Sequence, residues 1–238
     1  NNQGIDRITA RLRRTRTNIP RGLNLGANKD SKQQVEDFGY VLMRAAAHID
    51  FATINVSSPN TKDLRKLQGK NALEDLLGRV NTANNALDIR VPIFLKIAPD
   101  LSENDVQDIA DISLSENLSA IICTNTTLDR NDLSSHHQNQ SGGLSGRPLF
   151  EKSTRVLAQM RSATNSQIDL IGVGGVSSAE DAYKKIRAGA NAVQLYSALV
   201  YESLSLIPKI AIGLNDILIR DGFENIKEAV GLDTEKWL

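Results

Sequence analysis

The sequence has few of the residues that would tie it to a membrane, an oxidising compartment or a highly charged partner. Its single cysteine, Cys123, excludes an internal disulfide and suits a reducing compartment. No apolar run approaches the length of a membrane span, and no signal peptide opens the chain. The 28 Lys and Arg residues equal the 28 Asp and Glu residues, so the charge balance favours neither nucleic acid nor an acidic partner. These absences indicate a soluble globular protein.

Metal ligands are also scarce. The three histidines, His48, His136 and His137, are not spaced with carboxylates or with Cys123 in any ligand pattern, so no metal site is predicted. His48 closes a helical pattern, where a role at the helix C-terminus is more usual than catalysis. Cys123 lies in an apolar run and is expected to pack in the core.

What the chain does contain is a strand and helix pattern that repeats six times. With 238 residues, 40% of them hydrophobic, it is long enough for one large core, and we expect a single domain over residues 1–238. Strands are predicted at 22–25, from residue 51, and at 91–97, 119–124, 168–173 and 192–195. Helices are predicted near 5–12, at 35–49 and 72–84, from Ser102, and at 150–161, 179–188 and 204–220. Because hairpin signals are absent, the sheet of this α/β fold should be parallel.

Six such units fit two architectures. One is a (β/α)₈ TIM barrel whose first two βα units would precede Asn1, and the other is an open, doubly wound sheet. We favour the barrel with its first two βα units missing from this chain. A long polar stretch at 129–146 follows the fourth strand, and we expect a lid there because compact domains seldom keep such loops without a use.

Polar residues cluster where the predicted strands end. In the stretch 51–61 (FATINVSSPNT), the apolar run stops at Asn55, and Pro59 keeps the polar side chains that follow at the strand's exit. The strand ends together supply Asn24; Asn55, Ser58 and Asn60; Lys96; Thr124, Asn125 and Thr126; Gly174 and Gly175; and Tyr196 and Ser197. This set is rich in amides, which suit a ligand edge of alternating N–H and C=O groups, such as a pyrimidine or a flavin ring.

Two of these clusters allow more than one interpretation. Gly174 and Gly175 could let backbone amides approach a phosphate, helped by Tyr196 and Ser197, or could form only a tight turn. Lys96 has an apolar neighbour on each side. It could be a Schiff-base nucleophile, a fixed positive charge beside a cofactor that becomes anionic, or a side chain that reaches solvent.

Six motifs in order along the chain carry a specific resemblance. They lie at 55–61 (NVSSPNT), 96–100 (KIAPD), 124–127 (TNTT), 142–148 (GGLSGRP), 171–176 (IGVGGV) and 195–198 (LYSA). Together they resemble the dihydroorotate dehydrogenase family, and most closely its class 2, quinone-linked branch. The catalytic base of that branch is a serine where the cytosolic class has a cysteine, and the matching position here is Ser58.

The resemblance implies an FMN-containing (β/α)₈ barrel that oxidises dihydroorotate to orotate in pyrimidine biosynthesis. Ser58 would take the C5 proton while hydride leaves C6 for the flavin. The implied substrate contacts are Asn55, Asn60, Asn125 and Thr126. The implied flavin-ring contacts are Asn24, Asn55, Lys96 and Thr124, and the ribityl and phosphate contacts are Ser145, Gly146, Gly174, Gly175, Tyr196 and Ser197. Lys96 would then stabilise negative charge on the reduced flavin.

The sequence also departs from the family. The first two barrel units and the N-terminal helices that bring class 2 enzymes to the membrane and its quinone have no counterpart here. Glu202, Ser203 and Leu204 stand where the family usually has a Gly-Pro turn. The expected location is peripheral, on the cytoplasmic face of the bacterial inner membrane, or alternatively on the mitochondrial inner membrane. Two other hypotheses stay open: a Schiff-base lyase that uses Lys96, and a non-catalytic fragment of the dehydrogenase.

Overall fold

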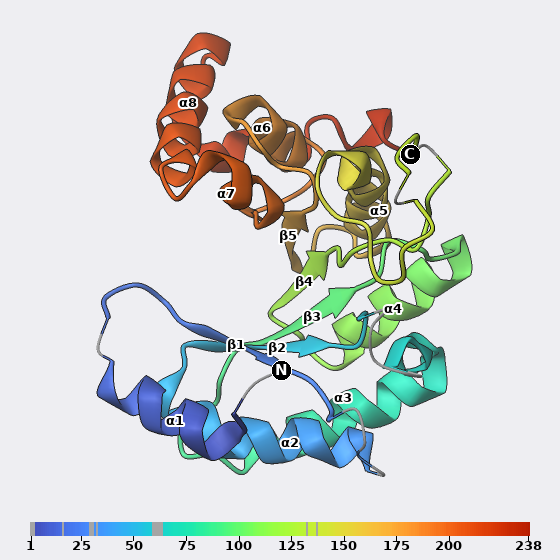
Figure 1. The fold of residues 1–238 in the computed structure, drawn as a ribbon, viewed down its shortest axis with the longest axis vertical. Coiled ribbons are helices and arrows are strands. Elements are labelled where there is room, and N and C mark those ends of the chain that lie inside the picture. The colour runs from blue at the N-terminus through green and yellow to red at the C-terminus, as the bar shows by residue number, and fades with distance from the viewer. Residues whose placement is uncertain are drawn as a thin grey trace.

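The core of the molecule is a curled sheet of six parallel strands in sequential order (Figure 1). The computed structural model describes residues 3–15, 17–28, 31, 33–58, 64–131, 133–136 and 138–238. The strands are β1 (Gly22–Leu25), β2 (Phe51–Asn55), β3 (Ile93–Ile97), β4 (Ala120–Cys123), β5 (Asp169–Val173) and β6 (Ala192–Gln194). A doubly wound sheet requires a point where the strand order reverses, and this sheet has none. The barrel-type prediction is therefore confirmed, as a six-stranded part of such a barrel.

Helices lie along the outer side of this sheet (Figure 1). They are α1 (Ile5–Arg14), α2 (Gln34–Ala45), α3 (Lys70–Asn85), α4 (Glu103–Ser115), α5 (Phe150–Ala163), α6 (Ala179–Arg187), α7 (Ser197–Glu202) and α8 (Leu206–Asp221). Short 3₁₀ helices are η1 (Ala46–His48), η2 (Leu64–Gln68), η3 (Arg147–Leu149), η4 (Ile226–Ala229) and η5 (Thr234–Lys236). Among the described residues, none of the helices combines the length and apolarity needed to cross a membrane.

The start of α4 shows why a helix begins where the sequence predicts one. Ser102 accepts a hydrogen bond from the backbone N–H of Asp105, and the Asp105 carboxylate accepts one from the N–H of Ser102. This reciprocal capping box satisfies two of the amides that the first turn leaves unpaired.

The alternation of side chains along the strands separates the core from the inner face of the sheet. One row in register, formed by Leu25, Ile54, Leu95, Ile121 and Leu170, is fully buried against the helices. The next row, one residue further along, consists of Asn55, Lys96, Ile122, Ile171 and Ala192. Because successive residues of a strand point to opposite faces, Asn55 and Lys96 point into the concavity, away from the helices.

The region after β6 differs from the sequence prediction. The chain forms α7 at once, and the last long helix begins at Leu206 instead of Leu204. Ser203, at the break between α7 and α8, has φ +63°. A residue with positive φ cannot continue an α-helix, so α7, which was not predicted from the sequence, ends there and stays separate from α8.

Candidate active site

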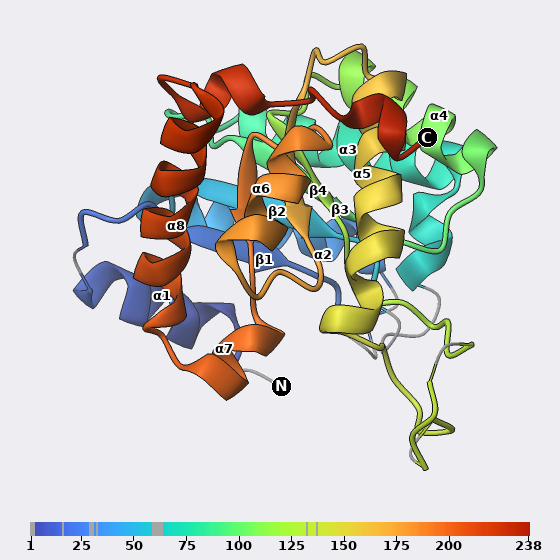
Figure 2. The same ribbon diagram turned by 90° about the horizontal axis from the view of Figure 1, so that it is seen from above.

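A cavity of about 970 Å³ opens at the carboxyl ends of β3 to β6. Ten of the residues predicted from the sequence line it: Lys96, Thr124, Asn125, Thr126, Ser145, Gly146, Gly174, Gly175, Tyr196 and Ser197. Figure 2 shows that α7 and the loop before α5 project from the same end of the sheet. In barrels of parallel strands this end carries the chemistry, so the cavity is the candidate active site.

Two asparagines and a serine form one hydrogen-bonded group beside the cavity. Asn125 donates from Nδ2 to Asn55 Oδ1 at 3.2 Å and to Ser57 Oγ at 3.1 Å. Ser57 Oγ in turn donates to Asn55 Oδ1 at 3.0 Å. Asn125 Oδ1 accepts from the backbone N–H of Thr126 at 2.8 Å. Within the described part of the chain, Asn55 Nδ2 has no hydrogen-bond partner, so it is a donor available to a ligand.

Lys96 supplies a positive charge to this site. It lies directly beside Asn55 in the strand register and lines the cavity. Burial lowers the pKa of its ammonium group. No carboxylate among the described residues forms an ion pair with it. A partly desolvated and unpaired ammonium group attracts an anionic or electron-rich ligand, which fits the fixed-charge interpretation of Lys96.

The turn after β5 forms the opposite end of the cavity. Gly174 and Gly175 have φ values of +121° and +74°, a region that favours glycine. A Cβ on Gly175 would lie 2.6 Å from Phe150 Cβ and 2.9 Å from Phe150 Cα. The turn is therefore tight and its glycines line the cavity, and their role in binding a phosphate stays a prediction.

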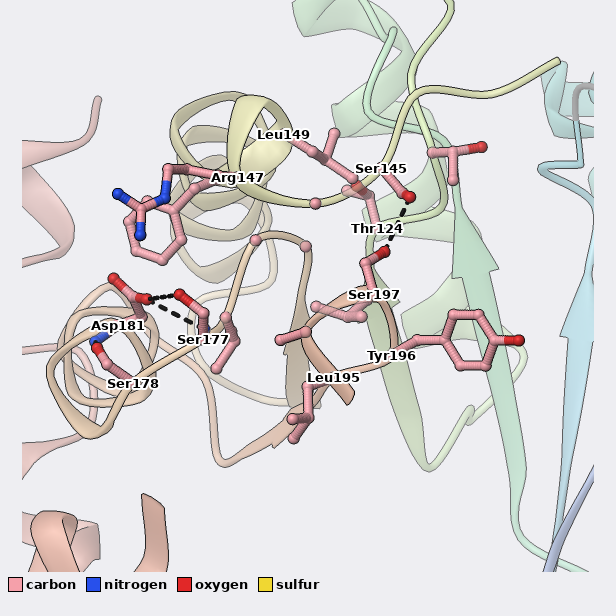
Figure 3. A pocket seen from close by; sticks show the side chains of 18 of the residues that line it. Thr124, Ser145, Arg147, Leu149, Ser177, Ser178, Asp181, Leu195, Tyr196 and Ser197 are labelled. Atoms are coloured by element: carbon pink, nitrogen blue, oxygen red, sulfur yellow. Dashed lines mark hydrogen bonds between the residues drawn. The ribbon is translucent and has the colours of Figure 1, made fainter. Parts of the chain in front are cut away.

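Hydroxyl groups and a guanidinium group surround this turn. Ser197, the first residue of α7, donates from its Oγ to Ser145 Oγ at 2.8 Å. Ser177 donates to Asp181 Oδ2 from both its N–H and its hydroxyl. Figure 3 shows the two pairs on opposite sides of the turn, with Arg147 above Asp181. Backbone, hydroxyl and guanidinium donors are the groups that bind phosphate.

Four other predicted residues do not line the cavity, and one of them, Asn55, lies beside it, hydrogen-bonded to Asn125. Asn24 is exposed on β1, on the same face of the sheet as Asn55. Ser58 is half-buried, three residues after Asn55, and is not among the residues that line the cavity. Asn60 lies outside the described residues. The stretch 129–146 contains no helix or strand among its described residues, apart from the bridge of Leu144 to Thr127, and its role as a lid stays a prediction.

A charged cluster beside the site was not anticipated from the sequence. Asp100 contacts Lys152 at 2.7 Å and Arg65 at 3.0 Å, and it also accepts hydrogen bonds from the hydroxyl of Thr127 and the N–H of Leu128. Burial opposes ionisation of this carboxyl, but these donors outweigh burial and lower its pKa to about 2. Asp100 belongs to the KIAPD motif and Arg65 follows the NVSSPNT motif closely. These positions, inside one motif and close to another, are the signal from which the sequence could have indicated a role for both residues.

A buried lysine lies behind the glycine turn. Lys185 of α6 is fully buried, and its Nζ donates to Ser153 Oγ at 2.6 Å and lies 4.9 Å from the centre of the Phe150 ring. Burial lowers the pKa of Lys185 from 10.5 to about 7. Burial also raises the pKa of nearby Cys123 to about 12, so this thiol stays neutral over the same range.

The pKa of Lys185 predicts a pH dependence of stability. Between pH 7 and 10.5 the unfolded chain keeps a proton on Lys185 that the folded chain has lost, so this residue makes folding more favourable as pH rises. Near pH 6 the parent protein must bury a charged lysine, so we expect Lys185→Met to have a higher free energy of unfolding than the parent. This difference should become smaller by pH 10. Urea unfolding at pH 6, 8 and 10 measures the free energy of unfolding of both proteins. Exposed Lys184 provides the control Lys184→Met, and a difference for Lys185→Met that is constant with pH would contradict the prediction.

Comparison with known proteins shows that the chain is similar to the members of one family. A family model described as Dihydroorotate dehydrogenase matches residues 1–218. A Cereibacter sphaeroides protein named dihydroorotate dehydrogenase (quinone) is 54% identical over 239 residues, covering 100% of this chain and 68% of the relative. An Oryza sativa protein named dihydroorotate dehydrogenase (quinone), mitochondrial, is 47% identical and covers 89% of this chain and 46% of the relative. The crystal structure of DHODH from Eimeria tenella in complex with ferulenol has a TM-score of 0.94 at 34% identity, covering 98% of this chain and 69% of that one.

Proposed function

The chain belongs to the dihydroorotate dehydrogenase family, and on that premise we propose that it oxidises (S)-dihydroorotate to orotate in de novo pyrimidine biosynthesis. FMN is the proposed hydride acceptor and a quinone the final electron acceptor. The observation that carries the proposal is the cavity, which is lined by Asn125, Lys96 and the glycine turn and has Asn55 hydrogen-bonded to Asn125 beside it. We further propose that residues 1–238 form a single FMN-binding domain.

The residues around the cavity fit a flavin mononucleotide. The unpaired ammonium group of Lys96 and the hydroxyl of Thr124 suit the polar edge of the flavin ring, and Asn24 and Asn55 share their face of the sheet. Gly174 and Gly175 present backbone where any side chain on Gly175 would meet Phe150. Together with Ser145, Gly146, Tyr196 and Ser197, they are the proposed contacts of the ribityl chain and the phosphate. When bound, FMN supplies the acceptor for the hydride that leaves C6 of the substrate.

The amide pair provides the proposed substrate contacts. A dihydropyrimidine ring carries alternating N–H and C=O groups, and Asn55 and Asn125 offer both donors and acceptors. Their mutual hydrogen bond at 3.2 Å fixes the two side chains relative to one another before any ligand binds. Thr126 and Asn60 complete the proposed set.

Ser58 is the proposed base that accepts the C5 proton. A serine hydroxyl is a weak base at neutral pH, so it can act only as hydride departure makes the C5 proton acidic and as its own proton passes to a relay or to water. Closure of the surrounding loop over the substrate would exclude bulk water from this transfer.

Bleaching of a flavin tests the proposal directly. Purified full-length protein reconstituted with FMN should be yellow, lose its colour on anaerobic addition of dihydroorotate, and regain it on addition of a quinone. Trapping of substrate on Lys96 by borohydride, in protein that binds no flavin, would select the Schiff-base lyase instead. A protein that binds FMN yet never bleaches would support the non-catalytic alternative.

The proposed quinone acceptor also concerns the location of the protein in the cell. We propose peripheral attachment to a membrane, on the cytoplasmic face of the bacterial inner membrane or alternatively on the mitochondrial inner membrane. The bacterial relative, at 54% identity, supports the first location, and the mitochondrial relative, at 47%, supports the alternative. Cosedimentation of the full-length protein with quinone-containing lipid vesicles tests the attachment, and a protein that stays in the supernatant would contradict it.

A further inference from the structure

Arg65 joins the loops that follow three neighbouring strands. It lies on η2, and each of its three guanidinium nitrogens donates to a different loop. Nε donates to the carbonyl of Ser57 at 3.1 Å, Nη1 to Asp100 Oδ2 at 3.0 Å, and Nη2 to the carbonyl of Thr126 at 2.9 Å. These acceptors follow β2, β3 and β4 respectively.

The two carbonyl groups adjoin the residues to which the chemistry is assigned. The Ser57 carbonyl belongs to the peptide bond that leads into Ser58, the proposed base. The Thr126 carbonyl is one residue beyond Asn125, the proposed substrate contact. Arg65 therefore holds the backbone on both sides of the space where the substrate would react, and all three of its guanidinium nitrogens donate to these loops.

The third acceptor anchors the guanidinium group. Asp100 is held by Lys152, by the hydroxyl of Thr127 and by the N–H of Leu128, and its pKa of about 2 keeps it ionised at neutral pH. A second contact fixes η2 to the same loop, since Gln68 Oε1 accepts from the N–H of Ala98 at 2.8 Å. The arginine is thus attached to a rigid support and has little freedom to shift.

We propose that Arg65 is a positioning residue that sets the distance and orientation between Ser58 and the Asn55–Asn125 pair. The inference rests on the proposed function, because it concerns the geometry of that reaction. A lysine cannot replace it, since a single ammonium group cannot direct donors to three separate acceptors in one plane. A displacement of about 1 Å in a reacting group can cost roughly 100-fold in rate, so the effect should fall on the reaction rather than on cofactor binding.

The test compares Arg65→Ala, Arg65→Lys and a matched arginine control in full-length protein reconstituted with FMN. Arg79 of α3 provides the control, because its guanidinium group is likewise engaged by other residues, in this case the carboxylates of Asp75 and Glu36, but lies on the exposed surface. We expect Arg65→Ala to slow anaerobic bleaching by dihydroorotate about 100-fold, with unchanged FMN content. We expect Arg65→Lys to remain slow, guanidinium ion to restore part of the Arg65→Ala rate, and Arg79→Ala to match the parent protein.

Hydrogen exchange gives a readout that does not depend on turnover. In the protein without FMN, the amides of residues 55–58 and 124–127 should exchange faster in Arg65→Ala than in the parent, while those of β5 stay unchanged. Bleaching at the parental rate in Arg65→Ala, or full activity in Arg65→Lys, would overturn the proposal. If the parent protein itself does not bleach, the proposed function fails, and unchanged exchange in Arg65→Ala would then separately show that Arg65 does not hold the loops.

Discussion

Ser58→Ala is expected to slow the bleaching of bound FMN by dihydroorotate by about 10²- to 10⁴-fold, the usual contribution of a positioned general base. Alanine removes the hydroxyl that would accept the C5 proton and leaves the neighbouring backbone in place. Ser58 is half-buried and lies outside the residues that line the cavity around the proposed cofactor. FMN content should therefore remain at the parental level. Stopped-flow absorbance under anaerobic conditions measures the rate, and full retention of activity would remove Ser58 as the base.

Two further variants make this result specific. Ser115→Ala is the matched control, because that hydroxyl donates only to the carbonyl of Ile112 within α4; its bleaching rate should equal that of the parent. Ser58→Cys should be more active than Ser58→Ala, and its rate should rise toward the ordinary thiol pKa of about 8.5, because the thiolate is a competent base. A Ser58→Cys rate that is flat from pH 6 to 9 would contradict a proton-transfer role.

Gly175→Ala is expected to destabilise the protein by about 2–4 kcal/mol and to abolish retention of FMN. The added Cβ would lie 2.6 Å from Phe150 Cβ and 2.9 Å from Phe150 Cα, at a residue with φ +74°. Phe150 begins α5, so its backbone cannot move without displacing the helix. The turn must therefore shift into the cavity, where the phosphate of FMN is proposed to bind. Urea unfolding and the ratio of flavin to protein absorbance measure the two effects.

A glycine in open surroundings provides the matched control. Gly78 lies within α3, and a Cβ there would meet nothing within 4 Å. Gly78→Ala should stabilise the protein by up to about 1 kcal/mol, because alanine is the better helix former, and should leave FMN content unchanged. Equal stability of Gly175→Ala and the parent protein would show that the turn has more room than the contacts with Phe150 indicate.

Much of the fold could be predicted because its signals are local. The apolar run before Asn55 became β2, and the pairing of Ser102 with Asp105 became the capping box that starts α4. Patterns of this kind depend on residues that are neighbours in sequence. The short helix α7 (Ser197–Glu202) was missed for the opposite reason. It ends at Ser203, whose positive φ has no signature in the residue itself.

The residues of the candidate site also fall into those that the sequence predicted and those that it did not. Asn125 and Gly175 were predicted because they end strands, and parallel strands bring their carboxyl ends together. Arg65, Asp100 and Lys185 were missed. Nothing in the sequence says that a guanidinium group on a 3₁₀ helix reaches carbonyls 8 and 61 residues away, or that a lysine on an amphipathic helix is fully buried.

The sequence alone determined that this protein is a parallel α/β chain with amide and glycine clusters at its strand ends, because strand periodicity and motif order are properties of neighbouring residues. Only the tertiary structure decided which of those side chains meet and which charges support them. Contacts between distant segments depend on sheet curvature and strand register, and these are set by the packing of the whole core.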